Sequence, residues 1–317
     1  MDTIPRILQL HPTVQRFGRY LVTLLAAVLC TSERLTADIA IDSYTANTND
    51  RFTNHSTFIA SGFNLSGIGQ TESGRWATAI SRNVIVSANH FEPSGVVRFY
   101  SDNNPSTAPV TRTIVSGQRV GISDLYIAVL DSELPNSIVH YSYANEILTT
   151  GATSPIVGFN AGIYQNLNAY MVGLSPESRP VFQDQAVGRN EISGYLENIN
   201  FLGNSTNDND ALLLVKDAVG SPQYVTYEAY VQSGDSGAPL FVSINGEFRL
   251  LGTNAFNGTI DSKSVSGINY IGNQASAINA YIVAVPEPST TLLVALGGMG
   301  AMILRRRFSS SKTPTIS

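Results

Sequence analysis

The sequence predicts an all-β protein, and three observations support that prediction. Apolar and polar residues alternate over short spans that are rich in β-branched and aromatic side chains. Loops of Asn, Asp, Ser and Gly separate these spans, as at residues 101–105 and 203–208. A helical pattern occurs only late in the chain, at residues 273–282. Many short strands between turns predict a sandwich or a barrel, followed here by one short C-terminal helix.

The composition narrows the possible functions. The chain has 317 residues, of which 43% are hydrophobic and 14% are charged, enough for one large domain or two smaller ones. The formal net charge of −5 argues against a nucleic-acid binder, which needs Lys and Arg to replace the counterions of phosphates. The single cysteine, Cys30, excludes an internal disulfide and a Cys-cluster zinc site. The sequence implies no metal and no organic cofactor.

Residues 1–37 have the organisation of an export signal. Arginines precede an apolar run at residues 21–30, which is too short to cross a bilayer, since a crossing helix takes about 20 residues. Leu35-Thr36-Ala37 then offers a cleavage site, after which the mature protein begins at Asp38. A buried N-terminal helix and an uncleaved anchor are the alternatives.

Residues 285–317 have the organisation of a second targeting signal. Pro286-Glu287-Pro288 precedes an apolar run at residues 291–304, and the basic triplet 305–307 follows at once. This order resembles the PEP-CTERM sorting signal of Gram-negative bacteria. The resemblance implies a transient membrane anchor and processing by an exosortase-type sorting enzyme at the cell envelope. An ordinary C-terminal anchor is the alternative, with the basic triplet on the cytoplasmic side.

The part between the two signals is acidic and rich in predicted strands. Residues 38–285 carry 11 basic and 21 acidic side chains, so the exported part has a net charge near −10. Examples of the predicted strands are residues 76–80, 84–87, 96–100, 125–130, 211–215, 240–242 and 248–252.

A serine between two glycines is the sharpest local feature of this part. Gly234-Asp235-Ser236-Gly237 suits a tight turn that exposes a hydroxyl. The same turn can direct the backbone N–H groups of Gly234 and Ser236 at one point, which is the arrangement of an oxyanion hole. Taken alone, such a turn is more often a plain surface turn.

A base and an orienting carboxylate are also available. A serine nucleophile needs a base, usually His, and that His needs a carboxylate to orient it. Of the three histidines between the signals, His90 ends a predicted strand, and Asp124 begins another. His55 and His140 are interpreted as surface or packing residues, Asp208 and Asp210 as solvated loop residues, and Trp76 as a core residue.

Three segments in the order His, Asp, Ser resemble the trypsin-like serine proteases of the chymotrypsin fold. They are residues 76–90, residues 124–130 and residues 234–240, and the resemblance covers roughly residues 55–283. It implies that His90 is the general base, Asp124 orients it and Ser236 is the nucleophile. It also implies two six-stranded antiparallel β-barrels, one within residues 38–150 and the other, with the helix, within residues 151–284.

Some positions depart from the family pattern. Phe91 follows the histidine where many members have a cysteine, and Ala238 stands where glycine is common. Ala255 falls where a serine often hydrogen-bonds the aspartate, so some orientation of Asp124 is at risk. No Ile-Val-Gly-Gly-like start is present, which leaves open whether Asp235 pairs with a new N-terminus or with another group.

The resemblance also places a specificity pocket. Tyr230 falls at its base, and Phe256, Asn257 and Gly258 fall on its side wall. None of them supplies a charge, which predicts cleavage after small or medium uncharged residues. Glu228 lies two residues before Tyr230 and would share its face on a strand, so a carboxylate at the pocket base is the alternative.

The expected function is therefore that of an exported serine endopeptidase acting on a protein or peptide substrate. The alternative is a catalytically weak or inactive surface or matrix binding protein on a protease fold. An α/β-hydrolase is excluded because residues 234–238 lack the final glycine of its nucleophile turn and the helices are missing.

Overall fold

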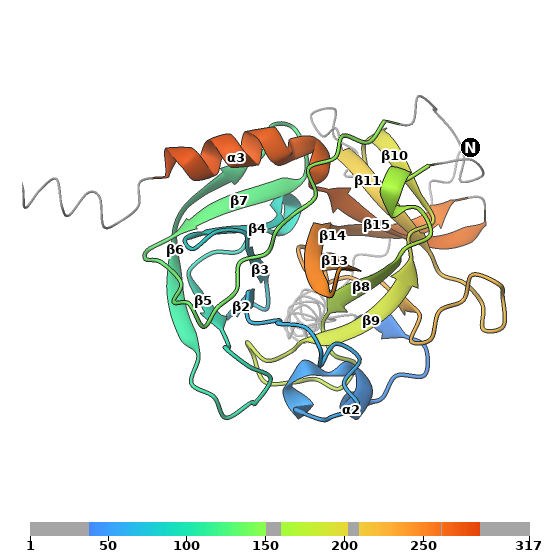
Figure 1. The fold of residues 1–317 in the computed structure, drawn as a ribbon, viewed down its shortest axis with the longest axis horizontal. Helices are drawn as coiled ribbons and strands as arrows, with labels where there is room; N and C mark the ends of the chain where they lie inside the picture. The colour runs from blue at the N-terminus through green and yellow to red at the C-terminus, as the bar shows by residue number, and fades with distance from the viewer. Residues whose placement is uncertain (1–37, 150–159, 202–208, 261, 286–317) are drawn as a thin grey trace, which may run out of the picture. The chain divides into compact units, whose positions relative to one another are not determined.

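The structure is a computed structural model that describes residues 38–149, 160–201, 209–260 and 262–285. Its described part is mainly antiparallel β-structure (Figure 1). In these residues no helix combines the length and the apolar character that crossing a membrane requires. The predicted export signal and the predicted membrane run at 291–304 lie outside the described residues.

Six strands of the first half form a closed antiparallel barrel in the order β2-β3-β4-β7-β6-β5. Pairing of β2 with β5 closes it. The strands are β2 (Ile68–Thr71), β3 (Trp76–Ala79), β4 (Val84–Ala88), β5 (Val96–Phe99), β6 (Val110–Arg119) and β7 (Leu125–Leu130).

Successive residues of a barrel strand point to opposite faces, and both faces are apolar in β4. Ile85 belongs to an apolar cluster made by the first half alone, whereas Val84 and Val86 belong to a larger cluster shared with the second half. Trp76 is fully buried in the shared cluster, which confirms it as a core residue. The barrel wall is therefore also the surface on which the second half packs.

The second half contains a seven-stranded antiparallel sheet in the order β10-β11-β15-β14-β13-β8-β9. Its strands are β8 (Asn168–Gly173), β9 (Ala186–Glu191), β10 (Gly194–Ile199), β11 (Asn209–Val215), β13 (Pro239–Ile244), β14 (Glu247–Ile260) and β15 (Lys263–Tyr270).

The two end strands of this sheet, β9 and β10, are consecutive in the chain. In a flat sheet they would lie about 29 Å apart, at about 4.8 Å per strand, whereas the short connection between them reaches only about 11 Å. The sheet must therefore curve. At the connection, the Ile192 N–H donates to the Leu167 carbonyl at 3.0 Å and the Ser193 N–H donates to the Leu213 carbonyl at 2.8 Å. The sequence predicted a second six-stranded closed barrel; the sheet has seven strands, and a closed second barrel stays a prediction.

Short elements complete the described part. They are β1 (Ala40–Ile41), which pairs with β12 (Ala229–Tyr230), the helices α2 (Ala46–Asn49) and α3 (Ala275–Ala284), and the 3-10 turns η1 (Arg51–Thr53), η2 (Asn89–Phe91), η3 (Gly162–Tyr164) and η4 (Gly272–Gln274). The α3 helix confirms the predicted C-terminal helix to within two residues at each end. It buries Ile278, and its Asn279 Oδ1 accepts a hydrogen bond from the Tyr143 hydroxyl at 2.5 Å.

Candidate active site

His90 lies in the 3-10 turn η2, directly after strand β4. The neighbouring strand β7 begins at Leu125, and the register pairs Ala88 with Leu125. Asp124 therefore stands beside the turn that carries His90. Its carbonyl accepts from the Asn89 N–H at 2.6 Å, and its Oδ1 accepts from the His90 N–H at 2.8 Å. Backbone pairing thus brings the two residues together before their side chains interact.

The His90 ring lies between a carboxylate and a hydroxyl. Its Nδ1 is 2.6 Å from Asp124 Oδ2, and its Nε2 is 2.9 Å from Ser236 Oγ. The Asp124 side chain is completely buried, whereas about a fifth of the His90 side chain is exposed. A buried carboxylate against Nδ1 favours the tautomer that carries its proton there, which leaves Nε2 as an acceptor towards Ser236.

Ser236 lies in the turn between β12 and β13, and glycines shape that turn. Gly234 and Gly237 have φ angles of 101° and 89°, a region that L side chains rarely adopt. A Cβ on Gly237 would lie 2.4 Å from Ser87 Oγ and 3.1 Å from the Ala88 nitrogen. The turn therefore packs directly on strand β4, two residues before His90.

Two backbone donors of this turn are available to a ligand. Within the described residues, neither the Gly234 N–H nor the Ser236 N–H donates a hydrogen bond to the protein. The Gly234 carbonyl is engaged instead, since it accepts from Trp76 Nε1 at 3.3 Å. Free amides on either side of Asp235 are the groups that an oxyanion hole requires.

Asp235 takes no part in the contacts of the triad. It is completely buried, and its carboxylate accepts from the backbone N–H groups of Leu174 and Gln232, both at 2.8 Å. Burial raises the pKa of Asp235 well above its ordinary value, and the nearby Asp38 and Asp184 raise it further. Two backbone amides are therefore the partners of Asp235, a point that the sequence left open.

The predicted pocket residues lie on two segments that meet. The Asn257 side-chain amide donates to the Val231 carbonyl at 2.8 Å, and the Tyr230 hydroxyl donates to the Gly258 carbonyl at 3.4 Å. The Glu228 carboxylate is used elsewhere, because it accepts from the Asp217 and Val225 N–H groups. Burial raises the pKa of Glu228 to about 7.

Sequence reasoning missed three residues of this region. Asn269 donates from its side-chain amide to Asp124 Oδ2 at 3.0 Å, and Asn209 Oδ1 accepts from the Asp124 N–H. Phe201 meets the His90 ring edge-on at 6.0 Å between centroids and stacks on Phe256 at 4.9 Å. Asn269 lies on strand β15 (Lys263–Tyr270), which also carries Ser266, so its amide did not stand out in the sequence.

The remaining candidates lie outside the triad. His55 is exposed and contacts Thr57 Oγ1 at 2.8 Å, as expected of a surface histidine. Asp210 is not a solvated loop residue as expected, because it lies half-buried on strand β11, where it accepts from the Asn273 side chain at 2.7 Å. Asp208 lies outside the described residues. Within the described ranges, no group of three or more His, Cys, Asp or Glu side chains could hold a metal ion.

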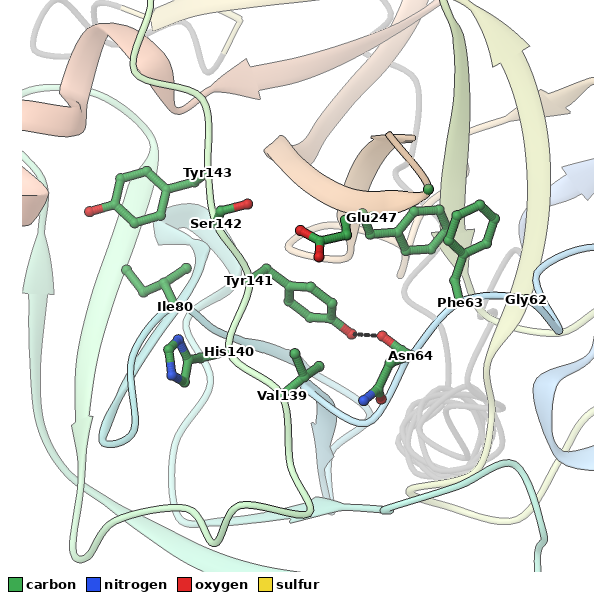
Figure 2. A pocket seen from close by; sticks show the side chains of 12 residues that line it. Gly62, Phe63, Asn64, Ile80, Val139, His140, Tyr141, Ser142, Tyr143 and Glu247 are labelled. Atoms are coloured by element: carbon green, nitrogen blue, oxygen red, sulfur yellow. Dashed lines mark hydrogen bonds between the residues drawn. The ribbon is translucent and has the colours of Figure 1, made fainter. Parts of the chain in front are cut away.

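His140 lines a cavity of about 660 Å³ that is separate from the triad (Figure 2). Tyr141, Tyr143 and Glu247 also line it, and the Tyr141 hydroxyl donates to the Asn64 carbonyl at 3.0 Å. Ile80 lies in the turn before β4, so the cavity is at the opposite end of that strand from His90. The length of β4 puts the two sites about 15 Å or more apart.

The described residues thus define an all-β protein with a closed barrel and a Ser–His–Asp arrangement between the barrel and the second sheet. The chain matches the PEP-CTERM protein-sorting motif over residues 284–307. This confirms the C-terminal resemblance, which implies an envelope-targeted protein of a Gram-negative bacterium that an exosortase processes.

Among solved structures, the chain is similar to two mutants of human heparin binding protein. A double mutant is 14% identical, with a TM-score of 0.46 over 70% of this chain and 93% of that chain. A single mutant is 12% identical, with a TM-score of 0.45 over 71% of this chain and 94% of that chain. No curated protein matches the sequence.

Proposed function

We propose that the protein is an exported serine endopeptidase that hydrolyses peptide bonds through an acyl-enzyme. One observation carries the proposal: the His90 ring contacts Asp124 through one nitrogen and Ser236 through the other, at 2.6 Å and 2.9 Å. A serine hydroxyl is a weak nucleophile unless a base accepts its proton. His90 is within reach of that proton and is held by a buried carboxylate, which is the geometry that such a base needs.

Each residue of the triad has a defined part in the reaction. Ser236 Oγ attacks the peptide carbonyl carbon while His90 Nε2 takes the hydroxyl proton. The imidazolium then gives that proton to the leaving amine, the C–N bond breaks, and an acyl-Ser236 ester remains. Water then attacks this ester in the same way, with His90 again as the base, and the acid is released. Asp124 stays ionised throughout and stabilises the imidazolium.

The free amides of the serine turn support the same reaction. The peptide carbonyl oxygen becomes negatively charged when Ser236 attacks, and the N–H groups of Gly234 and Ser236 are the donors for that charge. The glycine φ angle of 101° at residue 234 holds the first of these amides in the turn. The reaction needs no metal and no organic cofactor.

The sorting motif supports action at the cell envelope. In this proposal the partners are a protein or peptide substrate, an exosortase-type enzyme and, before processing, the membrane through residues 291–304. Protein recovered from the native envelope should begin near Asp38 and end near Pro286-Glu287-Pro288, because both signals are removed. Intact-mass measurement tests this, and a mass that includes residues 305–317 would point to a plain anchor instead.

A binding protein on the same fold is the second candidate, and the separate cavity favours it. The cavity beside His140 has aromatic walls and a carboxylate, Glu247, and none of its lining residues belongs to the triad. Such a mixture suits recognition of a ligand without chemistry. This candidate requires a folded protein whose serine turn does not react.

A fluorophosphonate probe separates the two candidates. We expect covalent labelling of the exported protein at Ser236, identified by peptide mass, and loss of labelling in Ser236→Ala. Ser233→Ala is the matched control, since Ser233 is exposed on the same turn and should leave labelling intact. A folded protein that never labels would support the binding protein.

A further inference from the structure

We infer that Asn269 is the positioning residue that holds Asp124 in the orientation that His90 requires. The inference rests on the proposed function. In the family pattern a serine often hydrogen-bonds the aspartate, but Ala255 stands at that position in this chain, and Asn269 would take over that role. Asn269 lies on strand β15, whereas His90, Asp124 and Ser236 lie at the ends of other strands. It touches neither Ser236 nor a substrate site, so it would act through Asp124.

The hydrogen bonds of Asp124 show what Asn269 contributes. Oδ1 accepts from the His90 N–H at 2.8 Å, and Oδ2 accepts both from His90 Nδ1 at 2.6 Å and from Asn269 Nδ2 at 3.0 Å. A carboxylate turns readily about its terminal torsion. If Asn269 were absent, the side-chain hydrogen bond to Oδ2 that remains among the described residues would come from the His90 imidazole. That imidazole is the group that Asp124 must itself orient. The Asn269 amide therefore fixes the carboxylate from a direction independent of the histidine.

The chemistry of the pair fixes the amide orientation. Asp124 is completely buried and Asn269 is 2% exposed, so water does not compete for the contact. An ionised carboxylate only accepts hydrogen bonds, and the Asn269 oxygen would repel it at this distance. The nitrogen must therefore face Asp124, as it does in the structure.

The surroundings of Asn269 argue for a role beyond sheet formation. Its backbone is already paired in register with Ala211 on β11 and Thr253 on β14, so the ladder does not need this side chain. Its Oδ1 is buried and has no hydrogen-bond partner among the described residues. A buried amide with an unused acceptor is costly, and an apolar residue would fill this strand position at less cost. The hydrogen bond to Asp124 is what the Asn269 side chain contributes at this position.

The first test is kinetic. We expect Asn269→Ala to lower kcat roughly 10- to 100-fold, the scale of a small misplacement in a catalytic group, with KM nearly unchanged. Asn190→Ala is the matched control: Asn190 is also fully buried on a strand, donates one side-chain bond, to the Ala229 carbonyl at 2.9 Å, and has an unpaired Oδ1. The Asn190→Ala variant should lose stability but keep the wild-type pH profile of kcat. An unchanged kcat in Asn269→Ala would overturn the inference.

The isosteric Asn269→Asp gives a second readout that a structural role would not move. It places a carboxyl 3.0 Å from Asp124, and two such groups share one proton at low pH and repel when both ionise. The second carboxyl adds an ionisation beside the triad, so the shape of the pH profile of kcat/KM should differ from that of the wild type. A profile that coincides with wild type would contradict the inference.

The unsubstituted protein supplies a test that does not depend on a variant folding. Because the Asn269 amide and His90 Nδ1 donate to the same oxygen, their protons should show a nuclear Overhauser effect. Its absence, with both protons observed, would overturn the inference whatever the activity. A protein that shows the effect but neither labels with fluorophosphonate nor turns over would defeat the proposed function alone.

Discussion

The two halves of the molecule contribute to the candidate active site in different ways. His90 and Asp124 come from neighbouring strands of the closed barrel, and the backbone ladder between β4 and β7 sets their separation. Ser236 comes from a turn, and glycines with positive φ angles together with contacts to Ser87 and Ala88 set its position. The base and its orienting group are thus fixed by sheet register, whereas the nucleophile depends on how closely the two halves pack.

The largest expected effects come from removing the reacting groups themselves. Ser236→Ala and His90→Ala should each lower kcat/KM by several orders of magnitude, and Asp124→Asn by roughly 10⁴-fold. The substituted asparagine would favour the wrong tautomer of His90, because its amide nitrogen donates where the carboxylate accepts. Hydrolysis of a peptide selected from a library measures the rates, and thermal unfolding shows that the variants are folded. Wild-type hydrolysis by a verified Ser236→Ala preparation would remove the mechanism.

A smaller effect should follow from overpacking the contact under the nucleophile. Gly237→Ala introduces a Cβ that would lie 2.4 Å from Ser87 Oγ, at a φ of 89°. We expect kcat/KM to fall about 100-fold, because the turn must move away from His90. Stability should fall by about 2–4 kcal/mol, the strain at positive φ adding to the overlap.

Gly220→Ala separates these two causes. Gly220 has the same φ of 89°, but nothing lies within 4 Å of an added Cβ. This variant should lose about 1 kcal/mol of stability and no activity. Equal loss of activity in both variants, measured under the same conditions, would show that packing against β4 does not position the nucleophile.

The specificity prediction concerns the segments before and beside Ser236. Asn257 bonds to Val231 and Tyr230 bonds to Gly258, so side chains cross the space between the two segments. A substrate side chain entering there should be small or medium and uncharged, since an unpaired buried cation costs several kcal/mol. We expect Asn257→Gly to widen the range towards larger uncharged residues, with about a 10-fold gain in kcat/KM for them, the scale of one or two extra buried methylenes. A peptide-library profile of both proteins measures this.

Glu228 provides the control for that prediction. Its carboxylate accepts from the backbone of residues 217 and 225, so it should not pair a substrate cation. Efficient cleavage after Arg in the wild type, abolished by Glu228→Gln, would show that the pocket base lies at Glu228 and not at Tyr230.

The sequence predicted local features well and long-range ones poorly. The strands that carry His90 and Asp124 were found because their residues are apolar and β-branched, and α3 because of its spacing. Strand β6 is not among the strands named from the sequence, because its side chains are all partly or fully exposed and its apolar pattern is weak; pairing with β5 and β7 stabilises it. The strand break at Ile192 was missed because the chain only changes partner there, from Leu167 to Leu213, and such a change depends on distant segments.

In the candidate site, too, local features were predicted and long-range contacts were not. His90, Asp124 and Ser236 were predicted because each sits in a recognisable local motif. Asn269 lies 145 residues from Asp124 in the chain, and its contact exists only through the pairing of β15 with its neighbours. No local pattern distinguishes such an amide from an ordinary polar residue in a strand.

The smallest expected effect concerns Asp184, a half-buried carboxylate of the second half that lies apart from the triad. Burial raises the pKa of Asp184 to about 6 from its ordinary value of 3.8, although the Ser175 N–H bond lowers it. The folded protein therefore binds this proton more tightly than the unfolded chain does. The stability contribution is fully present below about pH 4 and is lost as the pH rises through about 6.

Asp184→Asn tests that sign. The asparagine keeps an oxygen to accept from the Ser175 N–H, at 2.8 Å in the wild type, and carries no charge at any pH. We expect the wild-type unfolding temperature to decline between about pH 4 and 7 and the decline to be shallower in this variant. Asp131→Asn is the control, because Asp131 is exposed and its removal should leave the wild-type slope. A decline in Asp184→Asn as steep as that of the wild type would mean that Asp184 does not take up a proton in the folded protein over this range. The pH dependence of the second half would then lie with Asp235 and Glu228, whose carboxyls are also raised in pKa by burial.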